Sequence, residues 1–350
     1  MTADTRRVPP FWPVALLAAV APGLAPAQLP SALEGCLRLE TESERLRCYD
    51  TVLGRTPTEM EAPDEPPPEP EPPAQADAEA PVPPPPSSPL AKRWQLIAPT
   101  DRGPFVITPY KPTYVLPVSW NFRSNSNPEP GARDRLDNIQ NLELKFQLSF
   151  KAKLLPELLT ERGDLWFGYT QLSFWQAYNN GESRPFRETN FEPELIYSYR
   201  TAFPFLGLTG RLLTLSLNHH SNGRSDPFSR SWNRVIGGVL LDRHNFALSV
   251  RGWWRIPESA DQDDNPDISS FYGRGEIGAF YQREDQTFAA IVRSNFELDT
   301  PRVGLQLDWS FPLGGVKGYV QAFSGYGDGL IDFDHISHRL SAGFMLTDWM

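Results

Sequence analysis

The feature that most constrains the fold is a strict alternation of apolar and polar residues, which recurs from about residue 95 onward. In Leu142–Lys151, one face carries Leu, Leu, Phe, Leu and Phe, and the other carries Glu, Lys, Gln, Ser and Lys. The pattern returns in Val303–Phe311 and Leu340–Leu346. Because successive side chains of a β-strand point to opposite faces, this period predicts strands with one apolar and one polar face.

The strands of soluble β-sandwiches also alternate, so the length and the ends of the strands decide between a sandwich and a transmembrane β-barrel. The runs are about ten residues long, which suits a membrane-spanning strand. Aromatic residues gather near the strand ends, as at Trp253, Trp254, Trp309, Phe311 and Trp349. The chain ends in an alternating strand, although its last residue is Met350 where an aromatic is more usual.

From Pro112 onward we count about twelve candidate strands, which suits a small to medium barrel. The predicted fold class is therefore all-β: a twelve-stranded antiparallel transmembrane β-barrel. Inward residues such as Lys145, Gln147 and Lys151 would fill a narrow lumen with hydrogen bonds and ion pairs, which disfavours a solute pore.

Composition excludes two other classes of protein. The mean hydropathy is −0.42, and no segment after the N-terminal region offers the roughly 18 apolar residues that a membrane helix needs. The net charge is −10 and no basic stripe is present, so we expect no nucleic-acid partner. Both observations are compatible with a barrel, whose strands face lipid only at every second residue.

The chain divides into four predicted segments. Residues 1–27 resemble a secretory signal, with two arginines, a short apolar stretch and small residues before a cleavage site at Gln28. A membrane anchor or a buried helix is the alternative. Residues 28–60 form a small segment, 61–92 a spacer rich in Pro, Glu and Ala, and 93–350 the barrel.

The small segment carries both cysteines of the chain, Cys36 and Cys48. In an exported protein an even pair is most simply a disulfide, with two free thiols or half of a metal site as alternatives. The sequence Ser31–Glu34 has the form of a capping box, so a helix is expected to follow it. We expect this segment to lie in the periplasm.

One apolar row continues into polar residues that can do chemistry. Leu213, Leu215 and Leu217 form the lipid-facing row of a strand, and continuing by twos reaches His219 and then Ser221. On the next strand the outward row begins at Asn233. A serine, a histidine in reach and a carbonyl oxygen that orients the histidine form a nucleophile, base and orienter. The alternative is a solvated hairpin end, since Asn222–Gly223 is a good turn pair.

The segment Asn218–Arg234 resembles the signature of the outer-membrane phospholipase A family. Further similar segments extend this resemblance over roughly 105–350; they are Lys111–Tyr114, Lys145–Ser149, Pro185–Asn190, Asp263–Asp267 and Ser324–Gly327. The resemblance implies a twelve-stranded barrel, active as a homodimer, in the outer membrane of a Gram-negative bacterium. It implies hydrolysis of the sn-1 and sn-2 acyl esters of phospholipids and lysophospholipids, with His219 as base, Ser221 as nucleophile and Asn233 as orienter.

The same resemblance implies Ca²⁺ as the cofactor. Its ligands would be the backbone carbonyl of Arg224, Ser229 and Asp264, with Ser183 from the partner subunit and Asp226 at a possible second site. Such oxygen donors suit a hard cation that stabilises an oxyanion. Without the resemblance, the two serines would be ordinary loop residues and Asp263–Asp267 an Asx-type turn.

Two further residues complete the expected site. The N–H of Gly223 could bind the oxyanion, and Gln171 shares the outward parity of Phe167 and Tyr169, which suits a dimer interface. An interfacial Gln that contacts lipid headgroups is the alternative. We therefore predict a calcium-dependent outer-membrane phospholipase, with membrane phospholipids as substrate. The rival functions are another barrel lipid hydrolase, such as a lipid A deacylase, and a non-catalytic channel or structural barrel.

Overall fold

The computed structural model describes residues 36, 39, 41–52, 88–126, 128, 138–259, 261 and 263–350. The chain splits into two compact units, residues 1–75 and 76–350. The predicted signal, its cleavage site and most of the predicted spacer lie outside the described residues. None of the helices within the described residues is long and apolar enough to cross a membrane.

The first unit confirms the disulfide between Cys36 and Cys48. Its described helix is α2 (Glu42–Val52). Thr41 precedes the helix, and its hydroxyl oxygen accepts the backbone N–H of Glu44 at 3.4 Å. The threonine hydroxyl also donates to the Glu44 carboxylate, so this T-x-x-E sequence caps α2. The predicted capping box at Ser31–Glu34 lies outside the described residues.

The second unit is a closed antiparallel barrel, and the prediction of twelve strands is confirmed. A short extra strand, β1 (Ile107–Pro109), pairs with β3 outside this count. The barrel strands are β2 (Thr113–Asn121), β3 (Leu142–Leu155), β4 (Gly163–Trp175), β5 (Phe186–Phe205), β6 (Leu208–Ser221), β7 (Ser231–Arg243), β8 (Phe246–Arg255), β9 (Gly275–Arg283), β10 (Gln286–Ser294), β11 (Val303–Leu313), β12 (Val316–Gly325) and β13 (Ser337–Thr347). Each pairs with its neighbour in sequence, and β13 returns to β2.

The alternation in the sequence predicts strand starts near Glu192 and Ser270, and both starts lie five or six residues away in the structure. β5 begins at Phe186 and not near Glu192, so it is the longest strand of the barrel. β9 begins at Gly275 and not near Ser270, because residues 268–271 form the short helix α4 (Ile268–Phe271). The apolar residues of α4 pack inward, with Ile268 fully buried, and so gave an apolar signal that is not a strand.

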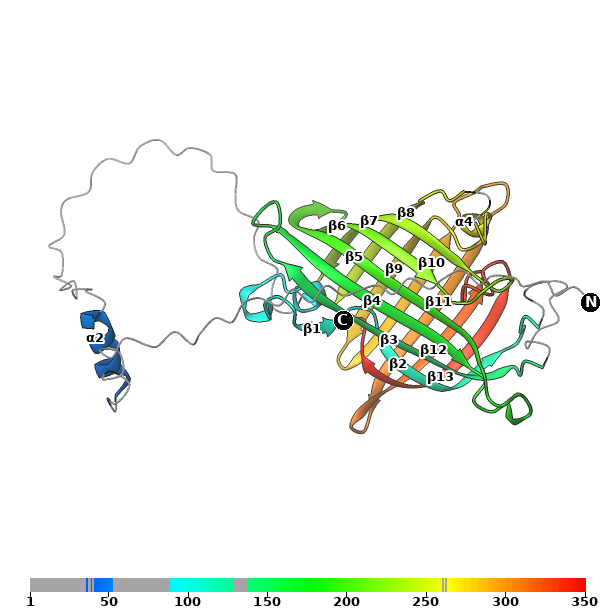
Figure 1. The fold of residues 1–350 in the computed structure, drawn as a ribbon, viewed down its shortest axis with the longest axis horizontal. Coiled ribbons are helices and arrows are strands. Elements are labelled where there is room, and N and C mark those ends of the chain that lie inside the picture. The colour runs from blue at the N-terminus through cyan, green and yellow to red at the C-terminus, as the bar shows by residue number, and fades with distance from the viewer. Residues whose placement is uncertain are drawn as a thin grey trace, which may run out of the picture. The chain divides into compact units, whose positions relative to one another are not determined.

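The two ends of the barrel differ (Figure 1). At one end, four connections have two residues each, as between β5 and β6, and β1 and the C-terminus lie there. At the other end, longer loops carry η2 (Asn180–Glu182) between β4 and β5 and α4 between β8 and β9. We call these the turn end and the loop end. Every residue of the predicted catalytic and calcium sites lies at the loop end.

Paired charges fill the part of the lumen around Glu143, as expected of a narrow barrel, whereas the buried Nζ of Lys151, which was expected to join them, has no hydrogen-bond partner among the described residues. Glu143 accepts hydrogen bonds from Arg187 at 2.6 Å and from Arg339 at 2.9 Å. Arg339 also pairs with Asp328 at 2.6 Å, and Lys145 reaches the same aspartate at 3.2 Å. Burial alone would raise the pKa of Asp328, but Arg339 and Lys145 hold that pKa below its usual value. Buried charges that are paired in this way compensate one another inside this part of the lumen.

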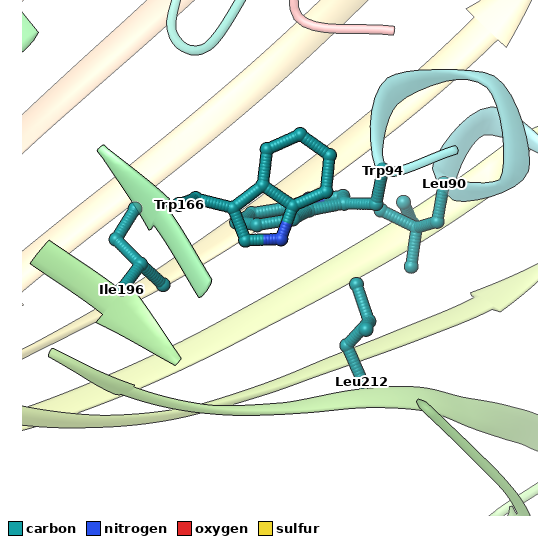
Figure 2. Close-up of a cluster of buried hydrophobic side chains, with 6 residues drawn as sticks. Leu90, Trp94, Trp166, Ile196 and Leu212 are labelled. Carbon is teal, nitrogen blue, oxygen red and sulfur yellow. The ribbon is translucent and has the colours of Figure 1, made fainter. Parts of the chain in front are cut away.

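A segment before β1 packs into the turn end of the lumen (Figure 2). It includes α3 (Pro89–Arg93), capped by Ser88, whose hydroxyl oxygen accepts the Ala91 N–H at 3.1 Å. Leu90 and Trp94 pack there with side chains from the barrel wall, namely Trp166, Ile196 and Leu212. Ser88, Leu90 and Ala91, which composition assigned to the spacer, are buried in this part of the structure.

Candidate active site

The strand β6 carries its apolar row on the outer wall of the barrel. Leu213, Leu215 and Leu217 are 43 %, 56 % and 56 % exposed, and His219 is exposed in the same row. On the opposite face of the strand, Leu212, Ser216 and His220 are buried. The expected outward direction of the His219 side chain is therefore confirmed. Ser221 follows on the same face, since residues i and i+2 of a strand share a side.

Asn233 lies directly across from His219 in the β6–β7 ladder, and Ser231 lies across from Ser221. The Nδ1 atom of His219 and the Oδ1 atom of Asn233 are 2.8 Å apart. Since an amide oxygen only accepts hydrogen bonds, the proton of the pair belongs to Nδ1. This tautomer leaves Nε2 as the basic nitrogen of the ring.

The inward neighbours hold this register. Trp232 donates its indole N–H to Nδ1 of His220 at 3.2 Å, and Arg234 donates to the Asn218 side-chain oxygen at 2.6 Å and 3.0 Å. These contacts cross the same two strands as the pair on the outside. A slip of one residue would exchange the two faces, so the buried contacts fix which histidine faces outward.

A cavity of about 200 Å³ lies inside the barrel, and His220 lines it together with Glu192, Arg251 and other residues. None of the three predicted catalytic residues is among the described residues that line it. The two adjacent histidines therefore face different environments: His220 faces the lumen and His219 faces the outside.

Asn222 shapes the loop that joins β6 to β7. Its side chain is buried, donates to the Phe228 carbonyl at 2.8 Å and accepts the Arg230 N–H at 3.0 Å. The oxygen also accepts the Arg224 N–H at 3.3 Å. Gly223 follows in the left-handed region with φ of 64°, where a Cβ atom would approach the Phe191 ring to 3.2 Å. The predicted turn pair thus fixes the backbone two residues after Ser221.

Two of the predicted calcium ligands come together. The Ser229 hydroxyl donates to Oδ2 of Asp264 at 2.5 Å, joining the β6–β7 and β8–β9 loops. Asn265 holds this arrangement, since its side chain accepts the Ser231 N–H at 2.9 Å and donates to the Ser231 carbonyl at 3.0 Å. Asp263 accepts the Asn265 N–H at 3.0 Å, which is an Asx turn. The Asx turn at Asp263 and the pair of oxygen donors at Ser229 and Asp264 are therefore both present in the same loop region.

The remaining predicted ligands lie on the same loops. Arg224 is anchored to β5, where its guanidinium donates to the carbonyls of Phe186 and Arg187. This anchor fixes the backbone that carries the predicted carbonyl ligand. Asp226 is exposed on the same loop. Ser183 is exposed after η2 with φ of 56°, and a single chain does not test its assignment to a second subunit.

The described residues contain no group of three or more His, Cys, Asp or Glu side chains placed to hold a metal ion. The predicted set differs from such a group because hydroxyl and backbone carbonyl oxygens supply most of its donors. Hard cations such as calcium accept these oxygens. The donors present at Ser229 and Asp264 therefore fit calcium.

Gln171 faces outward, as its parity predicts. Its Oε1 accepts the Tyr169 hydroxyl at 3.1 Å, and its Nε2 donates to the Ser173 hydroxyl at 3.3 Å. Across the strands it lies opposite Leu148 on β3 and Phe191 on β5. The result is a short polar track on an otherwise apolar wall, and the same parity places it on the face that also carries Ser221.

A second hydroxyl–imidazole pair lies on the outer wall at the loop end. Ser324 on β12 and Nδ1 of His338 on β13 are 2.9 Å apart, and the two residues are partners in the ladder. The Ser324 hydroxyl thus contacts the same ring nitrogen of His338 that the Asn233 side chain contacts in His219.

Sequence reasoning missed four residues that build the site: Asn222, Asn265, Arg255 and Glu258. The first two stood in recognised turn sequences, and their burial is what distinguishes them from ordinary turn residues. Arg255 donates to Asp263 at 2.5 Å, and Glu258 accepts the Asn233 amide N–H at 3.0 Å. Neither has a periodic sequence signal.

Comparisons with known proteins agree in pointing to one family. A sequence profile of the family described as Phospholipase A1 matches residues 90–346. "Phospholipase A1" of Klebsiella pneumoniae is 37 % identical over 247 residues, which are 70 % of this chain and 84 % of the relative. "Phospholipase A1" of Escherichia coli K12 is also 37 % identical over 247 residues, covering 70 % and 83 %.

Solved structures agree with the sequences. The outer membrane phospholipase A of Escherichia coli superposes with a TM-score of 0.67 at 34 % identity, covering 75 % of this chain and 99 % of the other. The outer membrane phospholipase of Salmonella typhi, described as a dimer with bound calcium, superposes with the same TM-score and coverage at 33 % identity.

Proposed function

This chain belongs to the phospholipase A1 family of outer-membrane hydrolases that act on phospholipid esters, and we propose that it hydrolyses these esters by a Ser–His–Asn mechanism on the outer wall of its barrel. The single observation that carries the mechanism is the 2.8 Å contact between His219 Nδ1 and Asn233 Oδ1 on the outward face. This contact fixes the tautomer of an imidazole that stands two residues before Ser221 on the same face of β6. We infer that both sn-1 and sn-2 esters, and lysophospholipids, are substrates.

The chemical steps use three side chains. His219 accepts the Ser221 proton at Nε2 as the serine oxygen attacks the ester carbonyl carbon. The imidazolium then returns this proton to the departing alcohol, leaving an acyl group on Ser221. In the second half His219 accepts a proton from water, whose oxygen attacks the acyl carbonyl. The imidazolium then returns this proton to the Ser221 oxygen as the fatty acid leaves. Asn233 holds the imidazole in the required tautomer throughout.

The oxyanion of each tetrahedral intermediate needs positive charge or hydrogen-bond donors. The Gly223 N–H is the donor that we assign to it, two residues after Ser221. The Arg224 carbonyl, Ser229 and Asp264 would hold calcium, together with the partner subunit's Ser183, and Asp226 would serve a second site. When bound there, calcium supplies positive charge near the oxyanion.

We propose that the active form is a homodimer in the outer membrane, with Gln171 in its interface. Gln171, Tyr169 and Ser173 form a hydrogen-bonded polar track on the lipid-facing wall, and a second copy of the chain would cover this track from lipid. We also propose that residues 1–27 are a cleaved signal and that residues 28–60 and the spacer lie in the periplasm.

A chromogenic thioester phospholipid assay on the purified protein, with and without a chelator, tests this proposal. We expect hydrolysis that calcium supports and that the chelator abolishes. Activity on a lipid A substrate without calcium would instead indicate the deacylase alternative. No hydrolysis of either substrate by the folded protein would indicate a non-catalytic barrel.

A further inference from the structure

Glu258 contacts the far side of the residue that orients the histidine. It lies in the loop that follows β8, and its Oε1 accepts the Asn233 Nδ2–H at 3.0 Å. The backbone N–H of Ile256 donates to the Asn233 carbonyl at 2.8 Å, which holds this loop against β7. The two ends of the Asn233 amide thus contact His219 and Glu258.

The carboxylate fixes the direction of the amide. A carboxylate can only accept hydrogen bonds, so the NH₂ group of Asn233 must face Glu258. The carbonyl oxygen must then face the Nδ1–H group of His219. Without Glu258 the amide could rotate by half a turn and present a donor to the imidazole, which would favour the wrong tautomer.

The carboxylate also strengthens the contact to the histidine. Hydrogen bonds to a charged group are shorter and stronger than neutral ones, and a chain of hydrogen bonds polarises its members. Donation from Nδ2 to Glu258 increases the negative charge on Oδ1 of Asn233. The amide oxygen then stabilises a protonated His219 better than an isolated amide would.

Arg255 keeps this charge in place. Its Nη2 lies 3.6 Å from Oε2 of Glu258 and donates to Asp263 at 2.5 Å. Its Nη1 donates to the backbone carbonyls of Asn265 at 3.2 Å and Pro266 at 3.1 Å. The two carboxylates share one guanidinium, which connects the Asn233 amide to the loop that carries Asp264.

We propose that Glu258 is a positioning residue, which extends the Ser221–His219–Asn233 trio by a carboxylate one amide removed from the imidazole. This inference rests on the proposed function. An Asp at position 233 would itself supply a negative charge to the histidine, whereas an Asn does not. In this inference the carboxylate of Glu258, in the loop after β8, supplies that charge instead.

The test is Glu258→Gln, which keeps an acceptor for Asn233 and removes the charge. The matched control is Glu297→Gln, an exposed carboxylate on the β10–β11 loop that pairs with Arg274 at 3.2 Å. With a thioester phospholipid in micelles at saturating calcium, we expect Glu258→Gln to lower kcat about tenfold and to leave KM within about twofold. The control should keep both constants.

A double-mutant cycle separates this role from general support of the loop. In an Asn233→Ala background the path to the histidine is cut, so adding Glu258→Gln should change kcat by less than about twofold. A further tenfold loss there would overturn the proposal. Wild-type kcat in the single variant would also overturn it.

The calcium dependence of the same variant supplies the remaining readout. We expect the half-activating calcium concentration of Glu258→Gln to stay within about twofold of wild type. Recovery of wild-type kcat at high calcium would mean that Glu258 acts through the Asp264 loop, against the proposal. Failure of the proposed function is distinguishable, because the wild-type protein would then show no calcium-dependent hydrolysis at all.

Discussion

The most informative structural perturbation is Asn265→Ala. Asn265 is only 2 % exposed, and both of its side-chain hydrogen bonds go to the backbone of Ser231, at 2.9 Å and 3.0 Å. The substitution removes both bonds and leaves the strands of the barrel intact. Each neutral hydrogen bond contributes about 1 kcal/mol, so the ordered loop loses about 2 kcal/mol of stabilisation.

That loss should appear as a higher calcium concentration needed for activity, because Asn265 holds Asp264 beside Ser229. At about 1.4 kcal/mol for each factor of ten, 2 kcal/mol raises the half-activating calcium concentration about 30-fold. The assay is thioester hydrolysis titrated with free calcium, on protein whose folding is checked by heat-modifiable migration in a gel. The control is Asn245→Ala, which removes an amide–carbonyl bond to Gln282 at the turn end.

A folded Asn265→Ala variant whose calcium requirement lies within about threefold of wild type would refute this reasoning. The same shift in Asn245→Ala would refute it as well, since it would show that truncating any loop asparagine has this effect.

Three further outcomes follow from the structure. Gly223→Ala should lower kcat about tenfold, because the left-handed backbone and the Phe191 ring both oppose a Cβ atom. An unchanged kcat in the thioester assay would show that activity does not require the left-handed backbone at residue 223. Asp264→Asn should raise the calcium needed for half-activity about tenfold, since it removes the charged donor beside Ser229; calcium titration that matches wild type would remove Asp264 from the ligand set. Trp94→Ala should destabilise the barrel by about 3–5 kcal/mol, since Trp94 packs against Trp166 in the turn end of the lumen; an unchanged denaturation temperature in heat-modifiability gels would contradict the assignment of Trp94 to the core.

The outward position of His219 could be predicted because it depends only on the two-residue period of a strand. Counting from Leu213 requires no knowledge of other strands, and Asn233 then follows from the parity of the next strand. The same period located the lumen charges at Lys145 and Lys151, both of which are buried. Strand parity is local information, so a single sequence carries it.

Contacts between loops could not be predicted in the same way. Glu258 reaches Asn233 and Asn265 reaches Ser231 across gaps of 25 and 34 residues. Neither contact has a repeating pattern, and both depend on the path of the β8–β9 loop. The packing of α3 into the barrel could not be predicted for a different reason. Its few buried apolar residues follow a proline-rich stretch whose composition indicates an extended spacer.

The central claim is that the nucleophile lies on the outer wall at Ser221, and the barrel provides its own control in Ser324, which contacts His338 at 2.9 Å on the same wall. The most direct measurement compares Ser221→Ala with Ser324→Ala in calcium-dependent phospholipid hydrolysis. Ser221→Ala should lose at least about a thousandfold in kcat, while Ser324→Ala should keep the wild-type rate. Undiminished hydrolysis by folded Ser221→Ala, or loss of activity in Ser324→Ala alone, would contradict the account.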